Sequence, residues 1–308
     1  MATKTRFESL PKKDRDEVYR IKALSDERAS NARQLVTGEL ALLQRHLAGP
    51  SEWSPMSLLA STLFSLKWEF CDRGIIQRLL RDDPAEEVLG LRTSGRLGYL
   101  VEVAGGPEFS GGYDCIHVFA MLSSIASNDR FAVSRFIERF PPPFKSGHPS
   151  TVLLANAVCA ALADDHAAFL GLAEKLRTRK ESRFFRAMYD CLLATMTRDS
   201  GLVCLALDEM LRWNRRQEHL NSSMQKLVCI PAHALYNICL DTFAKSGRTP
   251  PQPPQGDTWD AGLHSFSHQV NHDETSLCFD FSGINPILSQ WVGRLPSSVT
   301  VYDLLGGQ

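Results

Sequence analysis

Apolar residues recur through the middle third of the chain at the spacing of amphipathic helices. Three segments align on Asp129, Asp165 and Asp199, which are separated by 36 and 34 residues. Offsets of four, seven, eight and eleven after each Asp carry Val133, Phe136, Ile137 and Phe140, then Phe169, Leu172, Ala173 and Leu176, then Val203, Ala206, Leu207 and Met210. Offsets of seven, eight and eleven before each Asp carry Leu122, Met121 and Val118, then Val158, Ala157 and Leu154, then Leu192, Cys191 and Met188. This pattern predicts three units of two amphipathic helices each.

Each aligned Asp falls at the predicted turn between two helices. There its carboxylate can accept N–H bonds from the first turn of the second helix, and its charge suits the positive end of that helix. A helix pair cannot bury both faces alone, so neighbouring pairs are expected to stack. The period resembles that of tetratricopeptide repeats (TPR), although the Trp, Gly, Tyr and Pro signature of that family is absent. The sequence predicts a TPR-like array, and the alternative is a plain helical bundle.

The pattern predicts further helices outside the aligned units. Residues 14–47 and 55–82 have helical apolar spacing, and each run ends at a proline-containing break. Residues 222–245 form another helical run, in which Pro231 should kink or divide the helix. A short helix is predicted at 286–293.

Two stretches interrupt the helical pattern. Residues 93–113 contain six Gly, which favours a flexible connection with one short strand at 99–103. Residues 247–254 are too rich in Pro to be helical. We therefore expect an all-α chain in which TPR-like antiparallel pairs stack as a short solenoid, followed by an irregular C-terminal tail. The predicted boundaries are a helical region at 1–92, a Gly-rich connection at 93–113, repeats at 114–247, and a Pro-rich linker with the tail at 248–308.

Composition and charge narrow the function classes. Of the 308 residues, 44% are apolar and 22% are charged, which is typical of a folded protein. Lys and Arg number 34 against 35 Asp and Glu, so the basic surplus usual for nucleic-acid binding is absent. The charged N-terminus does not have the pattern of a secretory signal, and no run approaches the roughly 20 apolar residues that span a bilayer. We expect a cytoplasmic protein that binds neither nucleic acid nor membrane.

The eight Cys are spread along the chain, and no two have the C-x-x-C spacing of zinc ribbons or redox pairs. Most of them stand among Leu, Ala and Val, as reduced core thiols do.

Three histidines, His264, His268 and His272, are spaced four residues apart. On a helix they would share one face, but the first and third would be about 12 Å apart, too far for one mononuclear metal centre. Ser265 and Phe266 stand where an H-E-x-x-H motif would carry its glutamate. A polar surface helix or a partner-facing patch is the preferred interpretation, and no metal or other cofactor is predicted.

Catalytic motifs are weak in this sequence. Arg212 and His219 have the loose spacing of HEPN-type ribonucleases, but a basic helix end with Arg212, Arg215 and Arg216 explains the same residues. No G-x-S-x-G elbow or phosphate-binding glycine motif occurs. We expect no enzymatic activity.

Part of the chain resembles a known family of binding proteins. The segments are AALADDHAAF at 160–169, FRAMYDCLL at 185–193, IPAHALYNICL at 230–240 and AKSG at 244–247. Within 150–247 they resemble the all-helical immunity proteins of bacterial polymorphic toxin systems, in particular the family known as immunity protein forty-nine. The resemblance covers about a third of the chain, rests on apolar spacing, and brings no catalytic residues with it. It implies a cytoplasmic antidote used in bacterial competition, which binds a cognate toxin and blocks it.

Such an antidote needs aromatic and Arg anchors on its surface. The candidates are Arg212, Trp213, Arg215, Arg216 and Tyr236, with His264, Phe266 and His268 of the tail as a second set. A toxin that attacks nucleic acid would favour an acidic patch such as Asp164, Asp165 and Asp273. The alternative is a TPR-like scaffold or regulator that binds peptides without a toxin, and the sequence also leaves a homodimer open.

Overall fold

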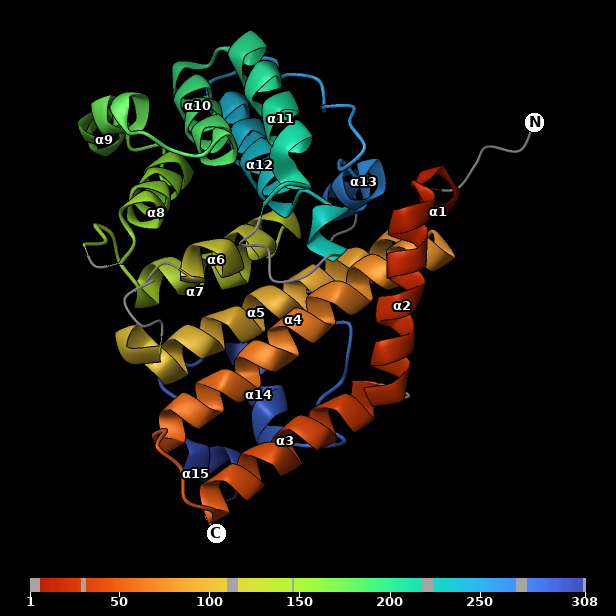
Figure 1. The fold of residues 1–308 in the computed structure, drawn as a ribbon. Helices are drawn as coiled ribbons and strands as arrows, with labels where there is room; N and C mark the ends of the chain where they lie inside the picture. Colours follow the sequence, from red (N-terminus) through yellow and green to blue (C-terminus); the bar gives the residue numbers. More distant parts are fainter. Residues whose placement is uncertain are drawn as a thin grey trace. The chain divides into compact units, whose positions relative to one another are not determined.

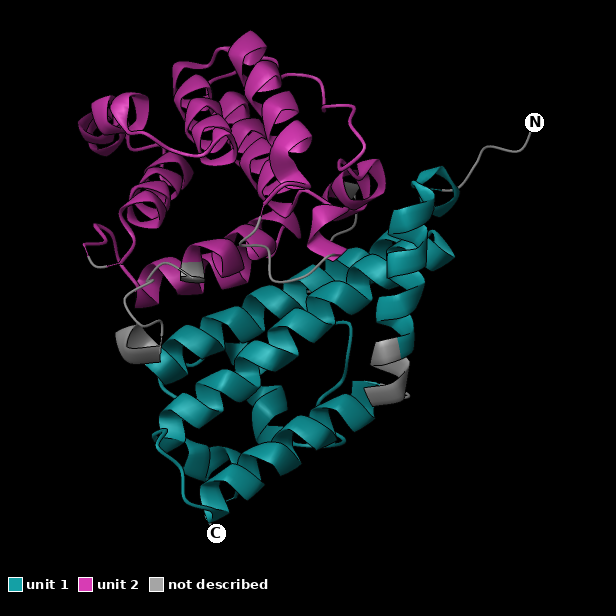
Figure 2. Ribbon diagram, in the orientation of Figure 1, with its two compact units in different colours: residues 1–110, 269–308 teal, residues 111–268 magenta. Residues whose placement is uncertain are grey.

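The computed structural model describes residues 6–28, 32–109, 116–145, 147–217, 224–269 and 276–306, and every regular element within them is helical (Figure 1). The chain divides into two compact units (Figure 2). Unit 1 comprises residues 1–110 and 269–308, and unit 2 comprises residues 111–268. No helix of the described residues is long and apolar enough to cross a membrane.

Unit 1 is organised around two long helices. Its elements are α1 (Arg6–Ser9), α2 (Lys12–Arg28), α3 (Ala32–Ala48), α4 (Pro55–Arg81), α5 (Pro84–Phe109), α14 (Pro286–Arg294) and α15 (Val301–Leu304). A prolyl residue opens both α4 and α5, where its missing N–H costs no helical hydrogen bond. Between them, Asp82 adopts a left-handed conformation and reverses the chain. The helices predicted at 55–82 and 286–293 are confirmed as α4 and α14. The predicted helical run at 14–47 contains two helices, α2 and α3.

Helices α4 and α5 approach closely because glycines face each other. A Cβ added to Gly90 would lie 2.8 Å from the Cα of Gly74 and 2.9 Å from the carbonyl oxygen of Phe70. Any side chain at this position would push the two backbones apart.

The expectation of a flexible, partly extended stretch at 93–113 is wrong for its residues up to 109. They continue α5 without interruption, and Tyr99, Leu100 and Val101 of the expected strand are buried in the helix. Glycine lowers helix propensity by only about 1 kcal/mol, and packing against α4 outweighs that cost. Residues 110–113 lie outside the described residues.

The predicted linker and tail at 248–308 is divided between the two units: residues 269–308 belong to unit 1, and the residues before them belong to unit 2. The Tyr99 hydroxyl donates to the Pro296 carbonyl at 3.1 Å, and Arg96 donates to the Val292 carbonyl at 3.3 Å. Phe70 of α4 packs against Phe281, with ring centroids 5.4 Å apart. Contacts between residues about 200 positions apart in sequence therefore complete this core.

Unit 2 contains shorter helices arranged in pairs. They are α6 (Ile116–Ala126) with α7 (Arg130–Arg139), α8 (Pro149–Leu162) with α9 (His166–Thr178), α10 (Arg183–Thr197) with α11 (Ser200–Asn214), then a 3-10 turn η1 (Met224–Lys226), α12 (Ile230–Lys245) and α13 (Ala261–Gln269). Pro231 divides the predicted run at 222–245 as expected, because it lies in the first turn of α12. Residues 248–256 are not helical, in agreement with the Pro-rich pattern.

The predicted turns at Asp129, Asp165 and Asp199 are confirmed. Each carboxylate accepts the backbone N–H three residues later, at 3.2, 2.9 and 3.0 Å respectively. The residue before each Asp has a positive φ and ends the first helix. Each Asp N–H donates to the carbonyl five residues earlier, which is a Schellman ending. One turn geometry is thus repeated three times.

Burial follows the aligned apolar positions, with one informative difference. All nine aligned positions in the first helices α6, α8 and α10 are buried. Of the positions after each Asp, those in α11 are all buried, whereas Val133 and Ile137 of α7 and Leu172 of α9 are only half-buried. The outer sides of the first two pairs therefore keep apolar side chains partly open to solvent.

Helix α12 contacts the first helix of every pair, α6, α8 and α10. It lies beside α10 and α11 in Figure 1. The all-helical class is confirmed, but stacking as a short TPR-like solenoid is not, because α12 packs most extensively against the first helix of the first pair.

Candidate protein-binding surface

The C-terminal end of α11 carries a stack of aromatic and cationic groups. Two guanidinium groups lie over the indole of Trp213, that of Arg183 at 4.8 Å and that of Arg216 at 4.6 Å from the ring centroid. Its Nε1 donates to Glu209 at 2.6 Å, and Arg212 pairs with the other oxygen of Glu209 at 2.7 Å. The ring is therefore held in one orientation by cation–π contacts and a hydrogen bond. Trp213 is half-buried, and Arg212 and Arg216 are exposed.

Two leucines extend this apolar surface along α11. Leu202 is 52% exposed and Leu205 is 67% exposed. They line a hollow of about 820 Å³ over α10 and α11, together with Arg183, Glu209 and Arg212. We call this surface, defined by Leu202, Leu205, Arg212 and the stacked Trp213, the α11 face. It combines an apolar centre with a charged rim, as protein interfaces do.

Sequence reasoning missed the two leucines, although a signal was present. They stand three and six residues after Asp199, outside the offsets of four, seven, eight and eleven that predict the buried face. Apolar residues outside that face have to point away from the helix pair. Leu170 of α9, 71% exposed, departs from the pattern in the same way.

A second hollow follows helix α8. A cavity of about 1100 Å³ between α8 and α9 and a cavity of about 530 Å³ among α7, α8 and α12 share Pro142, Cys159 and Ala163 as lining residues. We call the two cavities together the α8 groove. Its floor is one face of α8, with Val152, Asn156, Cys159 and Ala163 at helical spacing. Burial raises the pKa of the Cys159 thiol to about 12, so this floor residue is a neutral thiol.

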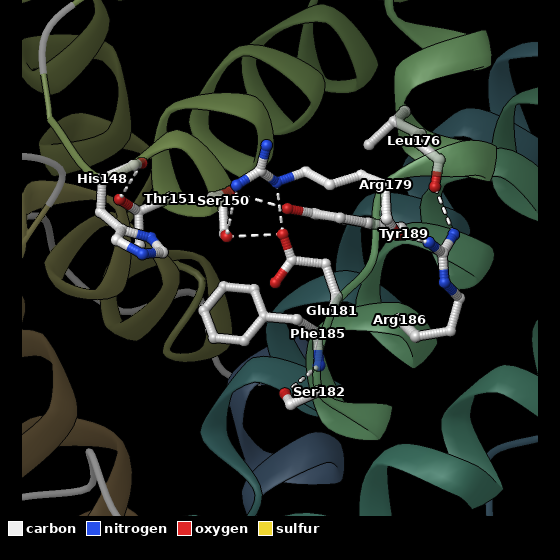
Figure 3. A network of polar contacts seen from close by, with 10 residues as sticks. All are labelled: His148, Ser150, Thr151, Leu176, Arg179, Glu181, Ser182, Phe185, Arg186 and Tyr189. Atoms are coloured by element: carbon white, nitrogen blue, oxygen red, sulfur yellow. Dashed lines mark hydrogen bonds and ion pairs between the residues drawn. The ribbon is translucent and has the colours of Figure 1, made fainter.

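Polar contacts fix two segments against the N-terminal half of α8. The Asn156 side chain accepts the Phe144 N–H at 2.8 Å and donates to the Phe144 carbonyl at 3.0 Å, which holds the loop before α8. At the start of α8, Glu181 accepts from Arg179 and from the Ser150 hydroxyl, and Tyr189 donates to the Ser150 carbonyl at 2.8 Å (Figure 3).

Arg186 completes the polar network at the end of α9. Its guanidinium donates to the carbonyls of Leu176 and Arg179, which are left without helical partners at this helix end (Figure 3). Burial raises the pKa of Tyr189 above its ordinary value, so its hydroxyl remains a donor to the carbonyl of Ser150. The segment between α9 and α10 is therefore fixed onto the start of α8.

No protein-family model, curated protein or solved structure matches this chain. What the α11 face and the α8 groove can do therefore has to follow from their own chemistry.

The first set of predicted anchors is partly brought together. Arg212, Trp213 and Arg216 lie at one end of the α11 face, and Arg215 is half-buried beside them in sequence. Tyr236 is not a surface anchor, because only 2% of it is exposed. Its ring packs against Trp259 and its hydroxyl donates to the Pro251 carbonyl at 2.8 Å.

The second set lies on α13, which packs against α12 within unit 2. The His264 ring is 5.1 Å from that of Tyr236, and His268 forms a 2.8 Å hydrogen bond with Asn237. Burial and the neighbouring His268 lower the pKa of His264 to about 4, so this ring is neutral near pH 7. His268 is exposed and Phe266 is half-buried. His264 and His268 are thus part of the packing of α13 onto α12.

The structure describes only some of the residues that the sequence suggests for metal binding and catalysis. His272 and His219 lie outside the described residues. Across the part of the chain that the structure describes, no group of three or more His, Cys, Asp or Glu could hold a metal ion. Arg212 is engaged with Glu209, as given above.

The predicted acidic patch is occupied by internal contacts. Asp164 pairs with Arg198 at 2.8 Å, and the Asp165 carboxylate caps α9. Asp273, its third predicted member, lies outside the described residues. The two aspartates stabilise the turns of unit 2.

Proposed function

We propose that this chain is a binding protein that docks onto another protein through the α11 face. The supporting observation is the pair of exposed leucines on the same helix as Trp213, whose hydrogen-bond partner Glu209 lines the same hollow as the leucines. Trp and Arg are enriched among the residues that dominate binding energy, and an indole held in place loses little freedom on binding. An exposed apolar centre of this kind is a recognised sign of an interaction site.

We further propose that the partner is a bacterial toxin, as the resemblance to the immunity proteins implies. The chain would act in the cytoplasm by occluding the toxin, without chemical turnover. The repeated Asp-capped turns support a TPR-like origin of the three helix pairs. The alternative is a TPR-like scaffold that binds peptides, and the α8 groove favours it.

The test pairs toxin affinity with cell survival. The toxin used is the candidate encoded beside the gene for this chain. The expected result is that the chain protects cells and binds this toxin. The double variant Leu202→Glu/Leu205→Glu should lose affinity by about 100-fold or more, because it places charge in the centre of the interface. Leu170→Glu on α9 is the matched control and should retain binding.

Kinetics separate the parts of the surface. Trp213→Ala should mainly speed dissociation, whereas Arg212→Glu on the rim should mainly slow association. A variant that binds the toxin at full affinity but fails to protect would show a chemical step and overturn the proposal. Absence of toxin binding by the unmodified chain would also overturn the toxin assignment.

A further inference from the structure

The α8 groove leaves apolar positions uncovered that the third helix pair buries. Val133 and Ile137 of α7 and Leu172 of α9 line it and are half-buried. The equivalent positions of α11 are Val203, Ala206 and Leu207, all buried. These aligned apolar positions are thus buried in the third pair but partly exposed to solvent in the first two pairs.

Small residues allow close approach to this side. Ala163 of α8 and Ala168 and Gly171 of α9 line the groove and are exposed. A Cβ added to Gly171 would meet nothing within 4 Å. Interaxial distances of packed helices are about 8–10 Å and depend on the side chains at the contact, so these small residues allow an added helix to approach α8 and α9 closely.

The charges around the groove are predominantly positive. Lys145 and Lys175 line it and are exposed, and Lys245, whose ammonium donates to the Leu162 carbonyl at 3.3 Å, lies at the α12 side. The lining carboxylates have internal roles: Asp129 and Asp165 cap helices, and Asp241 pairs with Arg130 at 3.5 Å. An incoming segment therefore meets ammonium groups around an apolar floor.

We propose that the α8 groove binds an acidic amphipathic helix of a partner protein. Its apolar side chains cover Val133, Ile137 and Leu172, and its carboxylates pair with Lys145 and Lys175. Such a helix in a groove is a recurring mode of peptide recognition. Because the hydrogen bonds of Asn156 already hold Phe144 of the lining loop against α8, little ordering of this side of the groove is needed on binding. This site goes beyond the proposed toxin binding, since it is a different surface from the α11 face, and it specifies the kind of segment that the groove accepts.

The test is selection from a displayed peptide library on the full chain. Each peptide is about 15 residues long, with Leu or Ala at helical spacing and with Glu, Lys or Gln at the remaining positions. The expected result is strong enrichment of Glu over Lys, and affinity of the selected peptide that falls as salt rises. Enrichment of Lys, or no preference at all, would overturn the proposal.

Matched variants locate the binding of the selected peptide. Lys145→Glu/Lys175→Glu should lower its affinity by about tenfold or more, whereas exposed Lys180→Glu outside the groove should change it by less than about twofold. Ala168→Trp should block the groove, and its exposed neighbour Ala167→Trp should not. Circular dichroism checks that each variant is folded.

Failure of this site is distinguishable from failure of the α11 face. Leu202→Glu/Leu205→Glu should leave affinity for the selected peptide unchanged. If Ala168→Trp binds the peptide as well as the unmodified chain, the helix does not occupy the α8 groove and the proposal fails.

Discussion

Unit 1 holds two helices of 27 and 26 residues against each other, whereas α6 to α12 of unit 2 have between 10 and 16 residues. Every helix end leaves backbone groups without helical partners, so short helices have more such groups for the same number of residues. Unit 2 satisfies part of them with one repeated Asp-capped turn. The stability of unit 1 therefore depends more on the close approach of its long helices, and that of unit 2 depends more on the hydrogen bonds at its helix ends.

The two units also differ in what they bury. The α4 and α5 helices of unit 1 bury Lys67, Arg78, Glu87, Arg96 and Glu102. The first helices of the unit 2 pairs bury almost only apolar groups, small hydroxyls and thiols. Unit 1 should therefore respond to pH through its core, and unit 2 should respond most to loss of apolar volume.

The largest expected effect tests the apolar core of unit 2. Leu192→Ala should lower the free energy of unfolding by about 2–5 kcal/mol through the cavity it leaves in α10. Leu170→Ala removes the same atoms from an exposed position and should change stability by less than about 0.5 kcal/mol. Urea denaturation, with hydrogen exchange on α10 peptides, measures both. Equal effects would contradict the assignment of inner and outer faces.

Close approach in unit 1 is tested by a single methyl group. Gly90→Ala should destabilise unit 1 by about 3 kcal/mol, because the new Cβ meets backbone atoms of Gly74 and Phe70 that cannot turn aside. Gly38→Ala in α3, where a Cβ meets nothing within 4 Å, should stabilise by up to about 1 kcal/mol. Thermal unfolding measures the stability of both variants, and hydrogen exchange on α4 and α5 locates the effect of Gly90→Ala. A neutral Gly90→Ala would mean that the two helices can move apart at no cost.

The buried carboxyl of unit 1 gives a pH prediction. Burial raises the pKa of Glu87 from 4.5 to about 7, opposed by the charges of Arg6 and Arg78. Between pH 4.5 and 7 the unfolded carboxyl ionises first, so the stability that this group contributes below pH 4.5 is lost as pH rises through 7. Glu87→Gln should remove this loss and stabilise unit 1 at pH 8 by about 1–3 kcal/mol. Urea denaturation at pH 5 and pH 8 tests it, and a variant with the unmodified pH dependence would refute the assignment.

The smallest expected effects come from the caps of unit 2. Asp165→Ala or Asp199→Ala should each cost about 1 kcal/mol, since a first-turn N–H loses its partner. The corresponding Asn variants keep an accepting oxygen and should lose only a few tenths of that energy. Urea melts compare the four variants. If neither Ala variant loses stability, these carboxylates do not stabilise the turns.

The regular part of the fold was predictable, because local rules decide it. Asp129, Asp165 and Asp199 act through residues three positions away, and the apolar offsets follow helical geometry. The glycines of 93–109 misled the prediction, because their effect depends on α4, which lies elsewhere in the chain. The contacts of Tyr99 and Arg96 with the C-terminal segment likewise depend on residues that no local pattern connects.

The candidate site was less predictable than the fold. Trp213 and its arginines were found from residue type, since Trp and Arg are common anchors. Tyr236 is also an aromatic residue of the kind that anchors interfaces, but it is covered by Trp259 and His264, which come from a later segment of the chain. The exposure of Tyr236 therefore depends on residues that no local pattern connects. Leu202 and Leu205, by contrast, were predictable from local sequence, because their offsets from Asp199 lie outside the buried set.

The position of α12 has a consequence for how this chain can evolve. Open repeat arrays lengthen by duplication of a unit, because each repeat contacts only its neighbours. Here α12 contacts α6 as well as α10, so an additional pair inserted before α12 would separate it from one of them. Gain or loss of a whole pair is therefore expected to disturb the packing of α12, whereas substitutions on the outer helices are not.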